Sequence, residues 1–178
     1  MNLFRACLLL ALLVCATPVG ATPMPVQHEL TQARLSGQGS YRWFGIKLYD
    51  AYLWCEQGAA IQSAPLDSKL ILELVYAREL TGARIASASI DEMRKLKVGT
   101  PTQHAIWLKQ MQEAIPDVRE GTRLSGVYLP GHGVRFYHDG QLLKEIADAE
   151  FARAFFAIWL DPRTSATRLR NQLLGLPA

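Results

Sequence analysis

The segments that favour β-strands fall into two groups in this chain, and a helical block separates the two groups. Alternating or aromatic-rich segments lie between residues 29 and 76 and again between residues 124 and 146. Strands that alternate with helices build parallel sheets, whereas grouped strands joined by short turns build antiparallel sheets. The order therefore predicts an α+β fold with an antiparallel sheet. Since no internal repeat or linker interrupts it, we expect a single domain.

The first group follows a proline-rich stretch, residues 22–26, which we expect to be a loose arm. Glu29–Leu35 alternates weakly, and Gly37-Gln38-Gly39 predicts a turn or a bulge. Tyr41–Trp54 is crowded with the aromatic residues that strands prefer. Lys69–Tyr76 places its leucines on one face and a more polar set on the other, so we expect the second face to be half solvated.

The helical block contains two amphipathic segments. Thr81 can cap the first helix, and its apolar residues recur at helical spacing until Gly99 ends it. Thr100-Pro101-Thr102-Gln103 then combines a capping box with proline at the first helical position. Pro116 stops this second helix.

The second group of strands reads as a three-strand meander: Leu124–Leu129, Val134–His138 and Gln141–Ile146. Asp139-Gly140 predicts a hairpin, because both central residues of a type I′ turn need positive φ. A helix follows from Ala149 to Leu160, and it is too apolar to be freely exposed. A short C-terminal helix completes the chain.

The first 21 residues have the pattern of a secretory signal peptide. Arg5 provides the positive start, Ala6–Ala16 an apolar run of eleven residues, and Val19-Gly20-Ala21 the small residues before a cut. A membrane-spanning helix needs roughly 20 apolar residues. We therefore expect cleavage near Ala21, a mature domain of residues 22–178 without a membrane span, and a periplasmic or secreted protein.

The part of the chain after this leader is almost electrically neutral. Without Arg5 it carries 18 basic and 16 acidic residues, a net charge of +2. That balance argues against a nucleic acid partner. Cys55 is the one cysteine outside the leader, so no internal disulfide can form. Its apolar neighbours predict a small buried side chain rather than a nucleophile.

The usual signatures of catalysis and cofactor binding are missing from the sequence. His28, His104, His132 and His138 have no zinc-site spacing, and no nucleophile elbow or phosphate-binding loop occurs. Gly37-Gln38-Gly39 lacks the third glycine and the following helix of a dinucleotide site. We therefore predict no catalytic residue, no metal and no cofactor.

Aromatic and basic residues in the strand region form the candidate ligand-binding group: Tyr41, Arg42, Lys47, Tyr49 and Tyr52. By strand alternation Tyr41, Lys47 and Tyr49 share one face, and Arg42 and Tyr52 the other, unless Gly45 breaks the strand. Lysine and tyrosine donors above an apolar core suit the carboxylate or phenolate of an amphipathic ligand. The same side chains equally suit the solvent face of an edge strand.

Two segments, GQGSYRWFGIKLYDAYLW at 37–54 and FARAFFAIWL at 151–160, resemble the exported bacterial chalcone isomerase-like family. The strand Leu70–Tyr76, Glu79-Leu-Thr-Gly82, the Pro-Gly-His-Gly turn and the terminal Leu-Leu-Gly175 match in the same order. The resemblance covers nearly the whole mature chain. It implies an open-faced β-sandwich, in which helices pack on one face of an antiparallel sheet.

The family resemblance also implies expectations about function. Plant chalcone isomerases cyclise a chalcone with an arginine near the glycine turn and a tyrosine early in the first helix, and related plant proteins bind fatty acids in the equivalent cleft. In this chain Tyr41 replaces that arginine, Arg42 is displaced by one position, and Ile85 stands at the tyrosine position. Tyr49 falls close to the catalytic threonine of the strand.

We therefore expect a non-catalytic protein that binds a small amphipathic or anionic ligand such as a fatty acid. Two alternatives remain open at this point. One is an isomerase or intramolecular lyase acting on an enone-like phenolic substrate. The other is an envelope module that docks a protein partner, which requires Phe155, Phe156 and Trp159 to form an exposed patch.

Overall fold

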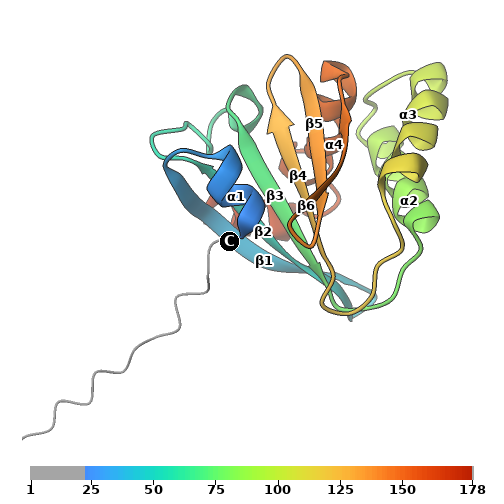
Figure 1. Cartoon of the computed structure of the whole chain (residues 1–178), viewed down its shortest axis with the longest axis horizontal. Coiled ribbons are helices and arrows are strands. Elements are labelled where there is room, and N and C mark those ends of the chain that lie inside the picture. The colour runs from blue at the N-terminus through green and yellow to red at the C-terminus, as the bar shows by residue number, and fades with distance from the viewer. Residues whose placement is uncertain (1–22, 178) are drawn as a thin grey trace, which may run out of the picture.

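One antiparallel sheet, in which sequence neighbours are also spatial neighbours, organises the molecule (Figure 1). The computed structural model describes residues 23–177, and the predicted signal peptide lies outside the described residues. The strand order is β1-β2-β3-β4-β5-β6, and all five pairings are antiparallel. The six strands are β1 (Ala33–Trp43), β2 (Ile46–Glu56), β3 (Leu70–Tyr76), β4 (Arg123–Leu129), β5 (Gly133–His138) and β6 (Gln141–Ile146).

Four helices cover one face of this sheet. The helices α2 (Gly82–Lys95) and α3 (Pro101–Ala114) lie side by side between β3 and β4 in the chain. After β6 come α4 (Ala149–Leu160), which packs on β4 and β5, and α5 (Thr167–Leu174), which packs on β1. A single 3-10 turn, Pro65–Asp67, precedes β3. The α+β fold and the open-faced sandwich predicted from the sequence are confirmed.

The helix boundaries follow from local capping. The Thr81 side chain accepts a hydrogen bond from the Arg84 amide, and Thr100 and Gln103 form the reciprocal capping box that the sequence predicts. The first helix ends at Lys95 rather than at Gly99. Lys97 already adopts a left-handed conformation, with φ 57°, so the helical hydrogen bonds cannot continue beyond it.

The hairpin between β1 and β2 corrects the expectation of one continuous strand over 41–54. Phe44 and Gly45 both have positive φ, 47° and 78°, as the two central residues of a type I′ turn require. Asp139 and Gly140 make the same turn between β5 and β6, as predicted. Gly37-Gln38-Gly39 lies within β1 beside a bulge, where the absent side chain of Gly37 lets the backbone of α5 approach closely.

The N-terminal stretch is a helix, α1 (Met24–Glu29), and not a loose arm, and the strand that follows starts at Ala33 rather than Glu29. The helix packs on the face of the sheet opposite to α4, in front of it in Figure 1. Val26 and Leu30 are buried there against Ile71 and Val127. The pattern of residues 22–26 gave no sign of this helix because the contacts that stabilise it come from distant strands.

The middle of the second face of β3 is therefore buried, whereas Lys69 and Val75 at its two ends are partly exposed. Ile71 and Glu73 are almost fully inaccessible, although both point away from the main core. Cys55 is buried in the main core, as predicted, and burial raises the pKa of its thiol.

Candidate functional site

A cavity of about 370 Å³ lies between the sheet and the covering helices. Every strand contributes to its lining, from Tyr41 in β1 to Leu143 in β6. Five intervals between strands correspond to a width of roughly 24 Å at about 4.8 Å per interval. The volume falls at the small end of the roughly 300–1,000 Å³ that ligand pockets occupy. The cavity is thus long and narrow.

A glycine lies in the middle of the strand lining of this cavity. Gly126 in β4 stands opposite Leu72 in β3 and Phe136 in β5, so β4 contributes no side chain there. The buried Phe156 ring packs against it, and a β-carbon at this position would come within 3.1 Å of that ring. Around the gap the lining is apolar, with Leu72, Leu74, Leu124, Phe136, Phe155, Ile158 and Trp159 among its members.

Three tyrosines provide hydroxyl groups on one side of the cavity. The rings of Tyr41 and Tyr49 stack with centroids 5.2 Å apart, and Tyr76 meets Tyr49 edge-on at 5.8 Å. The indole Nε1 of Trp159 donates a hydrogen bond to the Tyr49 oxygen over 3.1 Å. Within residues 23–177 no group accepts the Tyr49 hydroxyl proton, so this hydroxyl is available as a donor.

The same tyrosines are kept neutral. Burial raises the pKa of Tyr49 and of Tyr76 far above the usual range, and burial also raises the pKa of Tyr41. A buried phenolate would lose its hydration, and only Tyr41 has a nearby cation, Lys95, whose effect burial outweighs. At physiological pH these groups therefore donate hydrogen bonds, and they are poor bases or nucleophiles.

The mouth of the cavity runs along α2, which contributes Arg84, Ala88, Glu92 and Lys95 at successive turns. The Lys95 ammonium pairs with Glu92 over 2.6 Å, and the other Glu92 oxygen accepts a hydrogen bond from Ser165 over 2.6 Å. These charges are thereby compensated within the protein.

Arg84 is different from its neighbours at the mouth. Among the described residues its guanidinium makes no ion pair and no side-chain hydrogen bond. It also lies in the first turn of α2, where the helix dipole disfavours a cation. Asp117 lies at the same helix end but does not pair with Arg84. Its carboxylate accepts a hydrogen bond from the Gly82 amide instead. The mouth therefore presents one uncompensated positive charge beside an apolar interior.

The structure divides the residues that the sequence grouped as ligand-binding. Tyr41 and Tyr49 line the cavity. Arg42 and Tyr52 instead line a second groove along the edge strand β1, beside α5. That groove has a larger volume, about 750 Å³, but its lining is more polar than apolar, so it offers an apolar chain little apolar surface to pack against.

Lys47 lies in neither space, and its predicted face was wrong. Tyr41 pairs with Tyr49 but Arg42 pairs with Lys47, which leaves Leu48 as an extra residue in β2. This bulge reverses the alternation, so Lys47 joins Arg42 on the opposite face and forms an ion pair with Asp50 over 2.7 Å. Strand parity alone does not reveal a bulge.

Sequence reasoning also missed Arg84 and Tyr76 as members of the site. Tyr76 ends the apolar face predicted for its strand, and Arg84 lies three residues after the predicted cap, in a helical turn that disfavours cations. Ile85, at the position of the isomerase tyrosine, lines the cavity with an aliphatic side chain. Phe155, Phe156 and Trp159 are 7%, 0% and 6% exposed, so α4 offers no aromatic docking patch.

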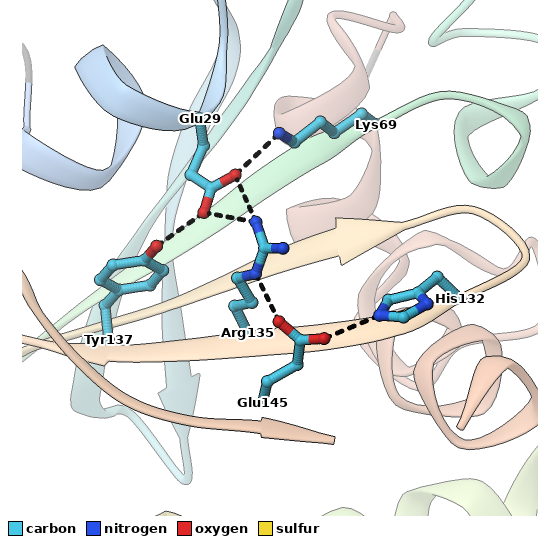
Figure 2. Close-up of polar contacts among 6 residues, drawn as sticks. All are labelled: Glu29, Lys69, His132, Arg135, Tyr137 and Glu145. Atoms are coloured by element: carbon cyan, nitrogen blue, oxygen red, sulfur yellow. Dashed lines mark hydrogen bonds and ion pairs between the residues drawn. The ribbon is translucent and has the colours of Figure 1, made fainter. Parts of the chain in front are cut away.

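A second group of ionisable residues lies on the opposite face of the sheet, and we call it the Glu29 cluster: Glu29, Lys69, His132, Arg135, Tyr137 and Glu145 (Figure 2). The Glu29 carboxylate accepts hydrogen bonds from Lys69 (2.7 Å), Tyr137 (2.6 Å) and Arg135 (3.1 Å). Burial alone would raise the pKa of Glu29, but these three donors outweigh burial and lower it to about 2.

The outer half of the Glu29 cluster is equally well paired. The Nε of Arg135 donates to Glu145 over 2.6 Å, and the His132 ring is 2.7 Å from the other Glu145 oxygen. The cluster thus attaches α1 to β5 and leaves no carboxylate oxygen of Glu29 free for a ligand. In the part of the chain that the structure describes, no group of three or more histidine, cysteine or acidic side chains could hold a metal ion.

The open antiparallel sheet with helices on one face defines the class of fold. The model of the family described as chalcone isomerase-like matches residues 20–175, and the chain belongs to this family. It is 31% identical over 139 residues to an uncharacterised protein of Haemophilus influenzae, and the match covers 78% of this chain and 66% of that protein. The chain thus spans just under two thirds of that relative.

A solved structure has the same fold. The crystal structure of a fatty-acid binding protein of Arabidopsis thaliana matches with a TM-score of 0.65 and 14% sequence identity, over 81% of this chain and 87% of that one. Between residues 23 and 177 no helix is both long and apolar enough to cross a membrane.

Proposed function

We propose that this protein binds a small amphipathic ligand with an anionic head group, such as a fatty acid, and does not transform it. The observation that carries the proposal is a narrow apolar cavity with one uncompensated cation, Arg84, at its mouth. The likeness of fold to a fatty-acid binding protein supports it. The bound state would combine burial of an apolar chain with a charge-assisted hydrogen bond.

The acyl chain would lie between β3 and α4, where Leu72, Leu74 and Phe155 face one another across the cavity. Its carboxylate would remain at the mouth and accept hydrogen bonds from Arg84 and from the Tyr41 hydroxyl. This orientation keeps the charge close to water. A carboxylate placed deep in the cavity would meet only neutral donors and would lose most of its hydration.

The geometry gives the isomerase alternative no comparable support. Cyclisation of an enone needs a group that stabilises negative charge on the enone oxygen and a group that handles the phenol proton. Among the cavity residues, Tyr49 and Tyr76 are neutral and lack a neighbouring cation, and Ile85 has no polar atom. Arg84 lies at the mouth, far from a buried reacting centre.

We also propose that the protein acts in the periplasm after removal of residues 1–21. The leader pattern of Arg5, the apolar run and the small residues before position 22 supports this location. The test is fractionation of expressing cells, followed by N-terminal sequencing of the protein. A chain that starts at Thr22 in the periplasmic fraction is expected, and a cytoplasmic protein that starts at Met1 contradicts this part of the proposal.

The binding proposal is tested by native mass spectrometry of protein purified from the periplasm. We expect an adduct with the mass of one fatty acid. After delipidation, displacement of a fluorescent fatty acid by dodecanoate should saturate at one equivalent, and dodecanol should compete more weakly because it lacks the charge. Absence of an adduct together with absence of saturable dodecanoate binding would contradict the proposal.

A further inference from the structure

The tip of the β1–β2 hairpin exposes a cluster of large apolar side chains. Trp43, Phe44 and Ile46 are 58%, 85% and 47% exposed, and the rings of Trp43 and Phe44 meet edge-on with centroids 4.8 Å apart. We call these three residues the tip cluster. Contact with water is unfavourable for each of them, and the rest of the chain buries most of its aromatic residues.

The backbone at Phe44 is also unfavourable for folding. Its φ of 47° lies in the left-handed region, which bulky residues rarely adopt and which asparagine, aspartate and glycine tolerate. Asp139 occupies the same position of the same turn in the β5–β6 hairpin, with the same φ. Apart from its contact with Trp43, the strained and exposed Phe44 side chain does not stabilise the hairpin, and we infer that it serves a contact outside the chain.

The charges around the tip indicate the chemistry of that contact. Arg42 and Lys47 bracket the tip cluster in the sequence, and no acidic residue occurs between Glu29 and Asp50. Lys47 pairs with Asp50, whereas the Arg42 guanidinium donates to the Gly45 carbonyl and forms no ion pair among the described residues. Aromatic rings flanked by cations are typical of segments that lie at a membrane–water interface, where the rings enter the head-group region and the cations meet anionic lipids.

The size of the tip cluster favours a lipid surface over a protein. Its exposed apolar area is roughly 400 Å², on the scale of 150–250 Å² for a whole aromatic side chain. A stable protein interface buries about 800 Å² on each partner. A convex hairpin tip of this size can enter a fluid head-group layer, but it is too small to hold a second copy of this chain.

The tip is continuous with the cavity, because Trp43 belongs to both. We propose that the tip cluster inserts into the surface of an anionic phospholipid bilayer and brings the cavity mouth to the membrane. The lipid contact itself does not depend on the proposed ligand. The benefit of placing the mouth there rests on the proposed function, since a membrane is the source of amphipathic acids.

The test is co-sedimentation of the purified protein with vesicles of phosphatidylcholine, with and without 30% phosphatidylglycerol. Phe44→Asn is the decisive variant, because Asn-Gly is the preferred sequence for a type I′ turn. We expect this variant to be at least as stable as the wild type and to bind the anionic vesicles about tenfold less well. Ile106→Gln removes an exposed apolar side chain outside the tip cluster, 52% exposed on α3 against 47% for Ile46, and should bind like the wild type.

Tryptophan fluorescence locates the contact. Trp107 and Trp159 are buried and Trp54 is partly buried, so lipids brominated near the head group should quench mainly Trp43. Trp43→Phe should abolish this quenching, which would assign the signal to the tip cluster. Arg42→Gln combined with Lys47→Gln should remove the preference for anionic vesicles.

Three outcomes overturn the proposal: wild-type protein that stays in the supernatant with both vesicle types, a Phe44→Asn variant that sediments like the wild type, and a dimer that this variant dissociates. The dodecanoate titration serves as the separate readout for the cavity. Vesicle binding without dodecanoate binding would leave the membrane contact standing and remove the proposed ligand. Dodecanoate binding without vesicle binding would support the proposed ligand and remove the membrane contact.

Discussion

The two faces of the sheet are built in opposite ways although they share the same strands. On the helix-covered face β3 contributes Leu72 and Leu74 to an unfilled apolar cavity. On the other face the same strand contributes Ile71 to a small closed core beneath α1. Next to that core, Glu29 accepts hydrogen bonds from Lys69, just before β3, and from Arg135 and Tyr137 in β5.

This difference separates two uses of polar groups. In the Glu29 cluster opposite charges are paired inside the protein, and the result is mechanical attachment of α1. At the cavity the Tyr49 hydroxyl proton and the Arg84 guanidinium lack partners among the described residues, and both border apolar space. Hydrogen-bond donors without a partner, placed next to an apolar space, are what an amphipathic ligand requires. Mutations on the α1-covered face should therefore change the stability of the protein, and mutations on the cavity face should change ligand binding.

The largest expected effect is on the α1 face. Glu29→Ala leaves Lys69 and Arg135 without their shared carboxylate and should lower the free energy of unfolding by about 3 kcal/mol. The value lies at the low end for a buried ion pair because those two side chains remain 31% and 32% exposed. Urea denaturation measures it. The affinity for dodecanoate, measured at urea concentrations well below the denaturation midpoint, should stay unchanged. A loss of affinity in this variant would contradict the claim that the two faces act independently.

The next effect is on binding alone. Ser89 is buried in the cavity wall on α2, and its hydroxyl bonds only to the Ile85 carbonyl of the same helix. Ser89→Phe should fill the cavity and weaken dodecanoate binding by about thirtyfold, or about 2 kcal/mol. Isothermal titration calorimetry measures the affinity. Ser87→Phe, at an exposed position of the same helix, is the matched control and should bind normally.

A smaller effect is expected for the head group. Arg84→Gln should weaken dodecanoate about tenfold, corresponding to loss of one charge-assisted hydrogen bond. Dodecanol affinity should change little, because the alcohol carries no charge. Arg94→Gln, which removes an exposed arginine elsewhere on α2, serves as the control in the same competition assay. Equal losses for the acid and the alcohol would show that Arg84 does not contact a carboxylate.

The smallest effect concerns pH and the Glu29 cluster. The pKa of Glu29 is about 2 in the folded protein against an ordinary value of 4.5, so its stabilising contribution is complete above pH 4.5 and declines as the pH falls toward 2. The stability difference between wild type and Glu29→Gln should therefore shrink by about 1 kcal/mol between pH 7 and pH 4. Urea denaturation at the two pH values measures this difference. A gap that stays constant or widens would mean that the carboxylate is not held by its three donors.

Much of the fold follows from local sequence signals. Asp148, Ala149–Leu160 and the break at Asp161-Pro162 define α4 with both ends correct, and Asp139-Gly140 defines its hairpin. These elements are predictable because a cap, a turn and an apolar pattern all lie within a few residues of one another. By contrast, α1 depends on Arg135, which lies 106 residues from Glu29 in the chain.

The candidate site was predictable only in part for the same reason. Tyr41 and Tyr49 have the expected face, whereas one extra residue at Leu48 sends Lys47 to the other side. The cavity itself is lined by side chains from all six strands and from α2 and α4. No single segment encodes that space, because it is the difference between side-chain volumes contributed by distant elements.

The most direct measurement is a crystal structure of the protein soaked or co-crystallised with 12-bromododecanoate, with data collected at the bromine absorption edge. The anomalous peak should lie inside the cavity among Leu72, Leu74 and Phe155, with the carboxylate density within hydrogen-bond distance of Arg84. A bromine peak confined to the polar groove beside α5, or an empty cavity at saturating ligand, would contradict the account.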